Sequence, residues 1–187
     1  MPADKGKIII ADDVRINRDL LKNIFRDRYE ILEAATDRET ITLLEENADV
    51  CLVLLSLLMP LQNGMRVLEY MADRGLTATI PVILITGPST PKAELQAYEY
   101  GVAEVIHKPF APFVTLRRAE NAIELYRQRN HMAQELERKN HELLESKERI
   151  IRNNNFLIMA LGSVVEFRSV ESGQHVQRVS HYTEVIL

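Results

Sequence analysis

The chain has 187 residues, of which 46% are hydrophobic and 27% are charged, and its formal net charge is -4. This length is sufficient for one well-buried core and part of a second. The acidic balance argues against the broad basic face that binds nucleic acid. Nothing resembles a signal peptide, and no apolar run approaches the length of a membrane span. We therefore expect a cytoplasmic protein with neither a nucleic-acid partner nor a membrane partner.

Short apolar segments alternate with helical patterns along residues 7–121. Strands are expected at residues 7–11, 29–34, 50–56, 81–86 and 105–107. Helices are expected at residues 16–27, 65–71 and roughly 91–100, and a further helix is expected to begin at Thr36, which forms a capping box with Glu39. This alternation predicts right-handed βαβ units and an α/β fold with a five-stranded, doubly wound parallel sheet.

The stretch from Val50 to Gly64 is a continuous apolar run that ends at Pro60 and a glycine-containing turn. A run without alternation is typical of a strand buried on both faces in the middle of a parallel sheet. Ser56 stands at the carboxyl end of this strand. Ligands of such sheets bind outside the carboxyl ends of the strands, so Ser56 is a candidate site residue.

Five polar residues stand at the ends of four predicted strands: Asp12, Asp13, Ser56, Thr86 and Lys108. They should converge on one edge of the sheet. Two adjacent carboxylates suit Mg²⁺, and a threonine hydroxyl and a lysine amine suit phosphate oxygens. The alternative is static: Asp12 or Asp13 caps the first helix and pairs with Lys108, while Thr86 is simply solvated.

These residues, with the Ser-Leu-Leu-Met-Pro segment, Gly64 and Lys108-Pro109, resemble the receiver domain of bacterial response regulators over about residues 7–121, and we expect a receiver-like domain over residues 1–121. The resemblance implies a flavodoxin-like strand order 2-1-3-4-5. It also implies that position 56 is the phosphoacceptor, that Thr86 and Lys108 contact the phosphoryl group, and that Asp12 and Asp13 bind Mg²⁺. A histidine kinase would be the partner of the aspartate form.

Two positions depart from the receiver pattern. Ser56 replaces the acceptor aspartate, which removes an ionised nucleophile and one metal ligand. Phosphorylation should therefore be blocked, and the binding of Mg²⁺ should be weaker. Val105 stands where the family usually has an aromatic switch residue. The alternative function is a constitutive dimerisation or docking module without a phosphorylation switch. A hydrolase with Ser56 as nucleophile is disfavoured, because the flanking leucines lack the glycines of a nucleophile elbow.

A long helix is expected over residues 113–161, starting from Pro112 and ending at Gly162. Residues of one column recur every seven positions, and a second column follows four residues later. The first column is Ala122, Arg129, Leu136, Leu143, Ile150 and Leu157, and the second is Ala133, Asn140, Lys147, Asn154 and Leu161. This pattern predicts a parallel homodimer, the alternative being a solvated helix that packs on its own domain.

Residues 162–187 resemble the start of an HD-GYP domain, a family that hydrolyses cyclic di-GMP at a metal centre. Glu171 and His175, one helical turn apart, would supply part of that centre. The resemblance implies an output phosphodiesterase that is largely absent from this chain. No catalytic activity is therefore expected of the chain itself.

Overall fold

The computed structural model describes residues 6–59, 62–87 and 91–166. The chain divides into two units, Met1–His131 and Met132–Leu187. The first unit contains a parallel sheet whose strand order is β2-β1-β3-β6-β7, which confirms the predicted fold and order. Its strands are β1 Lys7–Ala11, β2 Glu30–Ala34, β3 Val50–Leu55, β6 Val82–Thr86 and β7 Glu104–His107.

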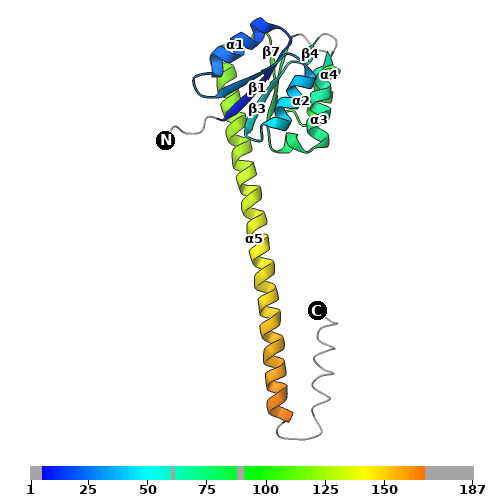
Figure 1. Ribbon diagram of the computed structural model, residues 1–187, viewed down its shortest axis with the longest axis vertical. Helices are drawn as coiled ribbons and strands as arrows, with labels where there is room; N and C mark the ends of the chain where they lie inside the picture. Colours follow the sequence, from blue (N-terminus) through cyan, green and yellow to red (C-terminus); the bar gives the residue numbers. More distant parts are fainter. Residues whose placement is uncertain (1–5, 60–61, 88–90, 167–187) are drawn as a thin grey trace. The chain divides into compact units, whose positions relative to one another are not determined.

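Helices cover both faces of this sheet (Figure 1). They are α1 Arg15–Phe25, α2 Asp37–Glu46, α3 Gly64–Asp73, α4 Pro91–Glu99 and α5 Pro112–Glu166, with a short 3-10 helix η1 Leu76–Ala78. Residues of α2, α3 and α4 form one core cluster with Ile9, Val53 and Leu84. Residues of α1 and the start of α5 form the other with Ile8 and Ile83. The sheet is therefore buried on both sides.

The central strand β3 has the expected burial. Four consecutive side chains from Leu52 to Leu55 are fully buried, alternating between the two clusters. Beyond Ser56 the chain forms a small antiparallel hairpin of β4 Leu58–Met59 and β5 Gln62–Asn63, which the sequence did not predict. The hairpin takes the place of the plain turn expected before α3.

Helix starts and stops follow local chemistry in most places. Thr36 caps α2 by accepting a hydrogen bond from the Glu39 N–H at 3.1 Å, as predicted. Gly101 ends α4 with a φ of 89°, a conformation that favours glycine. In α1, however, Ile16 is 70% exposed and Leu20 is also exposed, although both lie at the helical spacing that is typical of a buried face.

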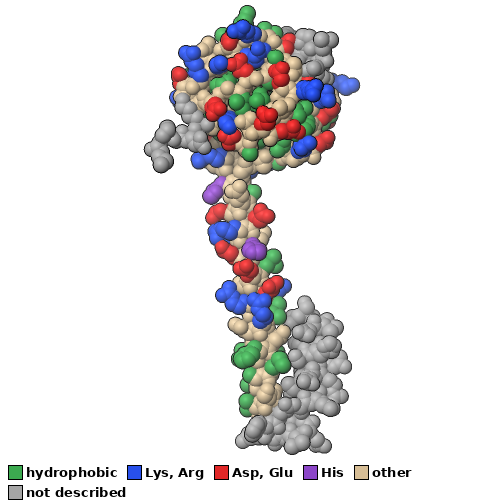
Figure 2. Space-filling model, in the orientation of Figure 1, with side chains coloured by type: hydrophobic (Ala, Val, Ile, Leu, Met, Phe, Trp, Pro, Cys, Tyr) green, Lys and Arg blue, Asp and Glu red, His purple; other side chains and the backbone are tan. Residues whose placement is uncertain are grey.

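Helix α5 is longer than expected, with 55 residues that continue through Gly162 to Glu166. The predicted break at Gly162 was wrong, because one interior glycine costs only about 1 kcal/mol relative to alanine. Beyond His131 the helix belongs to the second unit. There it displays acidic and basic side chains, with apolar ones more frequent toward Glu166 (Figure 2). None of the helices in the described residues is both long and apolar enough to cross a membrane.

Candidate functional site

The carboxyl ends of four neighbouring strands bring the predicted residues to one edge of the sheet. Asp12 follows β1, Ser56 follows β3, Thr86 ends β6 and Lys108 follows β7. Main-chain hydrogen bonds hold these ends together: the Ser56 N–H donates to the Ala11 carbonyl at 2.8 Å, and the Lys108 N–H to the Thr86 carbonyl at 2.7 Å. We call Asp12, Asp13, Ser56, Thr86 and Lys108 the rim.

Asp12 is the most heavily hydrogen-bonded member of the rim. Its Oδ2 accepts from the Lys108 Nζ at 2.8 Å, and its Oδ1 accepts from the Val14 N–H and from the Asn17 side chain, both at 2.9 Å. Asp12 therefore both pairs with Lys108 and holds the turn into α1. The pair with Lys108 is the one that the static alternative predicted. The predicted cap was wrong, because the N-cap residue of α1 is Val14 and it has no side-chain cap hydrogen bond.

Thr86 and Ser56 lie differently from what we expected. Both are buried, and the Thr86 hydroxyl has no hydrogen-bond partner within the described part of the chain. The expectation of a solvated Thr86 was therefore wrong, since the residue is 1% exposed. A buried hydroxyl without a partner costs about 1–3 kcal/mol. It is also a donor that is free to bind an oxygen of a ligand.

Gly64 allows the chain after Ser56 to pack closely on the rim. A Cβ atom added at Gly64 would lie 2.4 Å from the Ser56 carbonyl oxygen and 3.0 Å from the Leu57 Cα. Both obstacles are backbone atoms, so a side chain could be accommodated only by moving the main chain. The glycine that the sequence analysis noted thus positions the backbone of the residue at the phosphoacceptor place.

Three residues that the sequence analysis missed support the rim: Asn17, Arg18 and Glu33. The Arg18 guanidinium donates to the carbonyl oxygens of Asp12 and Asp13 at 2.8 and 3.2 Å, and its Nε lies 3.6 Å from Glu33. A hydrogen bond from Lys22 holds the pKa of Glu33 below its usual value. Arg18 therefore fixes the main chain on which both carboxylates stand.

The rim provides a limited donor set for a metal. Mg²⁺ prefers oxygen ligands and often keeps several waters beside one or two carboxylates. Both oxygens of Asp12 already accept hydrogen bonds, Asp13 is half-buried, and Ser56 offers a neutral hydroxyl. Among residues 6–59, 62–87 and 91–166, no group of three or more His, Cys, Asp or Glu could hold a metal. Oδ2 of Asp12 accepts a single hydrogen bond and keeps a second lone pair, so this oxygen and the Asp13 carboxylate would be the groups that hold a hydrated ion.

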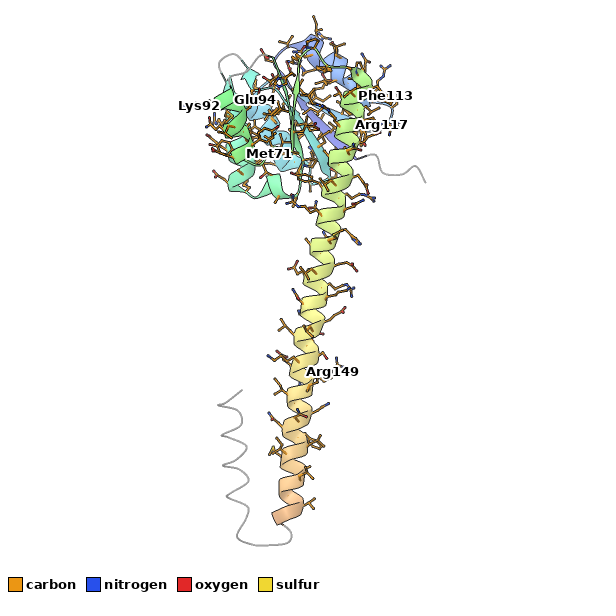
Figure 3. All side chains as sticks on the ribbon, turned by 180° about the vertical axis from the view of Figure 1, so that it is seen from behind. Met71, Lys92, Glu94, Phe113, Arg117 and Arg149 are labelled. Carbon is orange, nitrogen blue, oxygen red and sulfur yellow. The ribbon has the colours of Figure 1, made fainter. Side chains whose placement is uncertain are left out.

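The neighbours of Lys108 on β7 face away from the rim. His107 is exposed, and its Nε2 lies 3.7 Å from the Glu94 carboxylate, which stands on α4 (Figure 3). Val105 is half-buried against the core cluster on the α2–α4 face. His107 is therefore not placed to act as a base for Ser56. Glu171 and His175 lie outside the described residues.

The arrangement of the rim can be compared with known families. The model of the response regulator receiver domain matches residues 8–120. The chain belongs to this family. Receiver domains act in two-component signal transduction, interact with histidine kinases and generally bind Mg²⁺ at acidic residues.

Two curated relatives are similar to this receiver chain. A Vibrio cholerae protein named "Probable cyclic di-GMP phosphodiesterase" is 27% identical over 179 residues, which cover 96% of this chain and 40% of the relative. The Staphylococcus aureus transcriptional regulatory protein SrrA is 31% identical over 105 residues, covering 56% of this chain and 42% of that protein. The receiver chain thus spans about 40% of the length of these relatives.

Solved structures give the same family assignment. A receiver domain of a histidine kinase from Syntrophus aciditrophicus is similar at a TM-score of 0.57 and 26% identity, covering 64% of this chain and 90% of that one. A CheY-like receiver from Methanospirillum hungatei reaches a TM-score of 0.61 at 24% identity, covering 66% of this chain and 98% of that one. The second likeness concerns the fold alone.

Proposed function

We propose that this chain is a receiver module that does not accept a phosphoryl group with serine at position 56. In this proposal it controls a cyclic di-GMP phosphodiesterase output domain that lies largely outside the chain, and two copies associate through α5. The observation that supports the proposal is the rim, in which Lys108 pairs with the buried Asp12 carboxylate and the buried Thr86 hydroxyl has no partner among the described residues. Within the rim, the residue that departs from the receiver pattern is Ser56, a serine in place of the acceptor aspartate.

The chemistry of Ser56 supports the loss of phosphorylation. An aspartate is ionised at neutral pH, so it can bind a cation and attack phosphorus, whereas a serine hydroxyl needs a general base. His107, which precedes Lys108, is not placed to act as this base for Ser56, because its side chain points to Glu94 on α4. Mg²⁺ binding at Asp12 and Asp13 should also be weak, because the serine removes one charge and one oxygen ligand.

The link to a phosphodiesterase rests on the extent of one similarity. The alignment with the Vibrio cholerae protein covers 96% of this chain, well beyond the receiver match that ends at residue 120. We propose three segments: a receiver over 1–121, a signalling helix over 113–161 and the start of an HD-GYP domain over 162–187. Helix α5 reaches Glu166, so the proposed third segment would begin within the helix.

The phosphorylation proposal is tested by Ser56→Asp in the full chain. With acetyl phosphate and Mg²⁺, the variant should gain one phosphoryl adduct, as the carboxylate oxygen bonds to phosphorus and acetate leaves. The unmodified chain should gain none. Intact-mass spectrometry measures both, and a Ser56→Asn variant is a control that has similar size but no charge. An adduct on the unmodified chain, or none on Ser56→Asp, would contradict the proposal.

The second candidate is a constitutive docking module without a switch. Val105, which lacks the aromatic ring of the usual switch residue, favours it, because the two-state element that reads the phosphate would then be incomplete. Binding of beryllofluoride with Mg²⁺ to the Ser56→Asp variant separates the two. If the mimic binds and shifts the NMR amide resonances of α4 and β7, the chain retains a switch. If it binds without such shifts, the docking module is favoured.

The dimer is tested by light scattering on the full chain. The column Leu136, Leu143, Ile150, Leu157 and Val164 is between 55% and 69% exposed, and burying it against a partner is favourable. We expect a dimer that becomes monomeric in the variant Leu143→Glu, Ile150→Glu. The matched control, Gln134→Glu, should stay dimeric. A monomeric unmodified chain would contradict the proposal.

The absence of catalysis is also a proposal. Glu171 and His175 would supply at most part of one coordination sphere, whereas metal-assisted hydrolysis of a phosphodiester needs several more ligands. We expect no turnover of cyclic di-GMP with any added divalent metal. Turnover that disappears in the variant Glu171→Ala, His175→Ala would show that the catalytic site is more complete than we propose.

A further inference from the structure

Among the described residues beyond His131, one face of helix α5 carries ion pairs and another carries none. In heptad notation its contacts are Glu135–Arg138, Arg138–Glu142, His141–Glu145 and Glu148–Arg152, all at positions b, c and f. Position d is the column that contains Leu136 and Leu143, and position a is the column that contains Asn140 and Lys147. Together we call these two columns the seam face. The d column of the seam face consists of exposed leucine, isoleucine and valine side chains. Within residues 132–166 the seam face is therefore the exposed apolar side of the helix, which suits a partner.

The a column of the seam face is mostly polar. It contains Asn140, Lys147 and Asn154 between Ala133 and Leu161, and all three polar side chains are exposed. In the part of the chain that the structure describes, the side-chain amides of Asn140 and Asn154 have no intrachain hydrogen bond. An amide group carries both a donor and an acceptor, so it can pair with a second copy of itself.

We propose that the partner of the seam face is a second copy of this chain in parallel and in register, selected by Asn140 and Asn154. This inference rests on the dimer under "Proposed function" and adds the register of its two helices and the residues that select that register and the parallel direction. In such a pair each asparagine faces its own counterpart across the seam. Each apolar d residue likewise faces the same residue of the other copy. A polar a position specifies register and oligomeric state at a cost in stability.

Other alignments leave the amides without partners. In an antiparallel pair, a positions pack against d positions, so Asn140 would face the apolar d column. A parallel shift of one heptad places Asn154 against Leu161 and leaves it unpaired. A buried amide without a hydrogen bond is unfavourable. The in-register parallel pair is the alignment that pairs both asparagines.

The amides also limit the number of chains. Leu144 and Ile151 are exposed and lie beside the d column, so the apolar stripe is wide enough for a bundle of more than two helices. Asn140 and Asn154 interrupt that stripe with groups that need a polar partner. The layer formed by the two Lys147 side chains is the least favourable one of the proposed dimer, because two ammonium groups face each other. The long stem of lysine nevertheless allows each amine to reach water.

The direction is tested with single cysteines at the two ends of the d column. Leu136→Cys and Val164→Cys are each made in a Cys51→Ala background, because Cys51 is the only native cysteine. The two positions are roughly 40 Å apart along a helix, whereas a disulfide needs Cα atoms within about 7 Å. Each variant should cross-link to itself under mild oxidation. Gln134→Cys, at position b, is the control and should not.

The outcomes separate this inference from the dimer itself. Light scattering that shows a dimer, together with cross-linking of Leu136→Cys only in a mixture with Leu161→Cys, an a position at the other end of the helix, would mean an antiparallel pair and would overturn the inference alone. A dimer that cross-links in neither test would also overturn it. A monomer by light scattering would overturn the proposed dimer and the inference with it.

The role of the amides is tested by the variant Asn140→Leu, Asn154→Leu, with Gln134→Leu as a control for the added leucine. We expect a higher melting temperature and the loss of a single species, seen as larger assemblies or as cross-links in the mixed-cysteine experiment. The control should remain one dimer. A double variant that stays a single dimer with unchanged cross-links would refute the assignment of selectivity to Asn140 and Asn154.

Discussion

Removal of the lysine from the rim should destabilise the receiver unit strongly. In Lys108→Met the aliphatic stem is largely kept, but the carboxylate of Asp12 loses its charged partner at 2.8 Å. The Asp12 side chain is only 2% exposed, so water cannot readily replace the ammonium group. The variant therefore leaves a buried charge that is only partly compensated.

The magnitude follows from the contacts that remain. Breaking a buried ion pair by removing one partner typically costs about 3–5 kcal/mol. Asp12 keeps two hydrogen bonds, from Val14 and Asn17, and Lys108 is itself 26% exposed. We therefore expect a loss of about 2–3 kcal/mol in the free energy of unfolding. The matched control is Lys22→Met, because the Lys22–Glu33 pair is more exposed and should cost less than about 1 kcal/mol.

Urea unfolding of the full chain measures the difference. The chain has no tryptophan and α5 dominates the far-ultraviolet signal, so near-ultraviolet circular dichroism of tyrosines such as Tyr29, which packs edge-on against Phe25, is the suitable probe. The midpoint should fall while the slope stays constant. Adding Asp12→Asn to Lys108→Met should recover more than half of the loss, because it removes the uncompensated charge. A loss no larger than that of Lys22→Met, or no recovery in the double variant, would refute the reasoning.

Three further predictions concern packing and reactivity. Phe25→Ala should cost about 3–5 kcal/mol in urea unfolding, because Phe25 is fully buried, whereas Ile16→Ala on the exposed face should change stability by less than about 0.5 kcal/mol. Gly64→Ala should lower stability by about 1–3 kcal/mol and shift the amide resonance of Ser56, since its Cβ would lie 2.4 Å from the Ser56 carbonyl; unchanged resonances would contradict this. Burial raises the pKa of the Cys51 thiol to about 11, and since the thiolate is the nucleophile, labelling at pH 8 should be about 100-fold slower than for a free thiol and should accelerate as pH rises toward 11.

Much of the fold could be predicted because the sequence marks the elements locally. The strand β1 spans the predicted residues 7–11. Thr36 caps the start of α2, and Gly101 follows the end of α4, as the chemistry of each residue favours. Ile16 shows the limit of this approach. It satisfies helical spacing, yet the face that α1 buries is set by Leu21 and Phe25 against the sheet, which spacing alone does not reveal.

The rim was predicted in its membership but not in its environment. Strand ends identify Asp12, Thr86 and Lys108, because parallel strands share one carboxyl edge. Burial of Thr86 depends on how neighbouring segments cover that edge, which is a tertiary property. Arg18 was missed for a similar reason: its contacts with the carbonyls of the β1–α1 turn depend on the turn geometry, and no residue pattern marks them.

The placement of ion pairs on the outer face of α5 sets how the proposed dimer responds to ionic strength. Assemblies joined by ion pairs between chains weaken as salt is added, because mobile ions screen the attraction over a Debye length of about 8–10 Å. Here the attractions lie within each helix, at Arg138–Glu142 and Glu148–Arg152, while the charges that meet between copies are the two Lys147 ammonium groups. Added salt screens that repulsion, so two copies should associate more tightly at high ionic strength than at low.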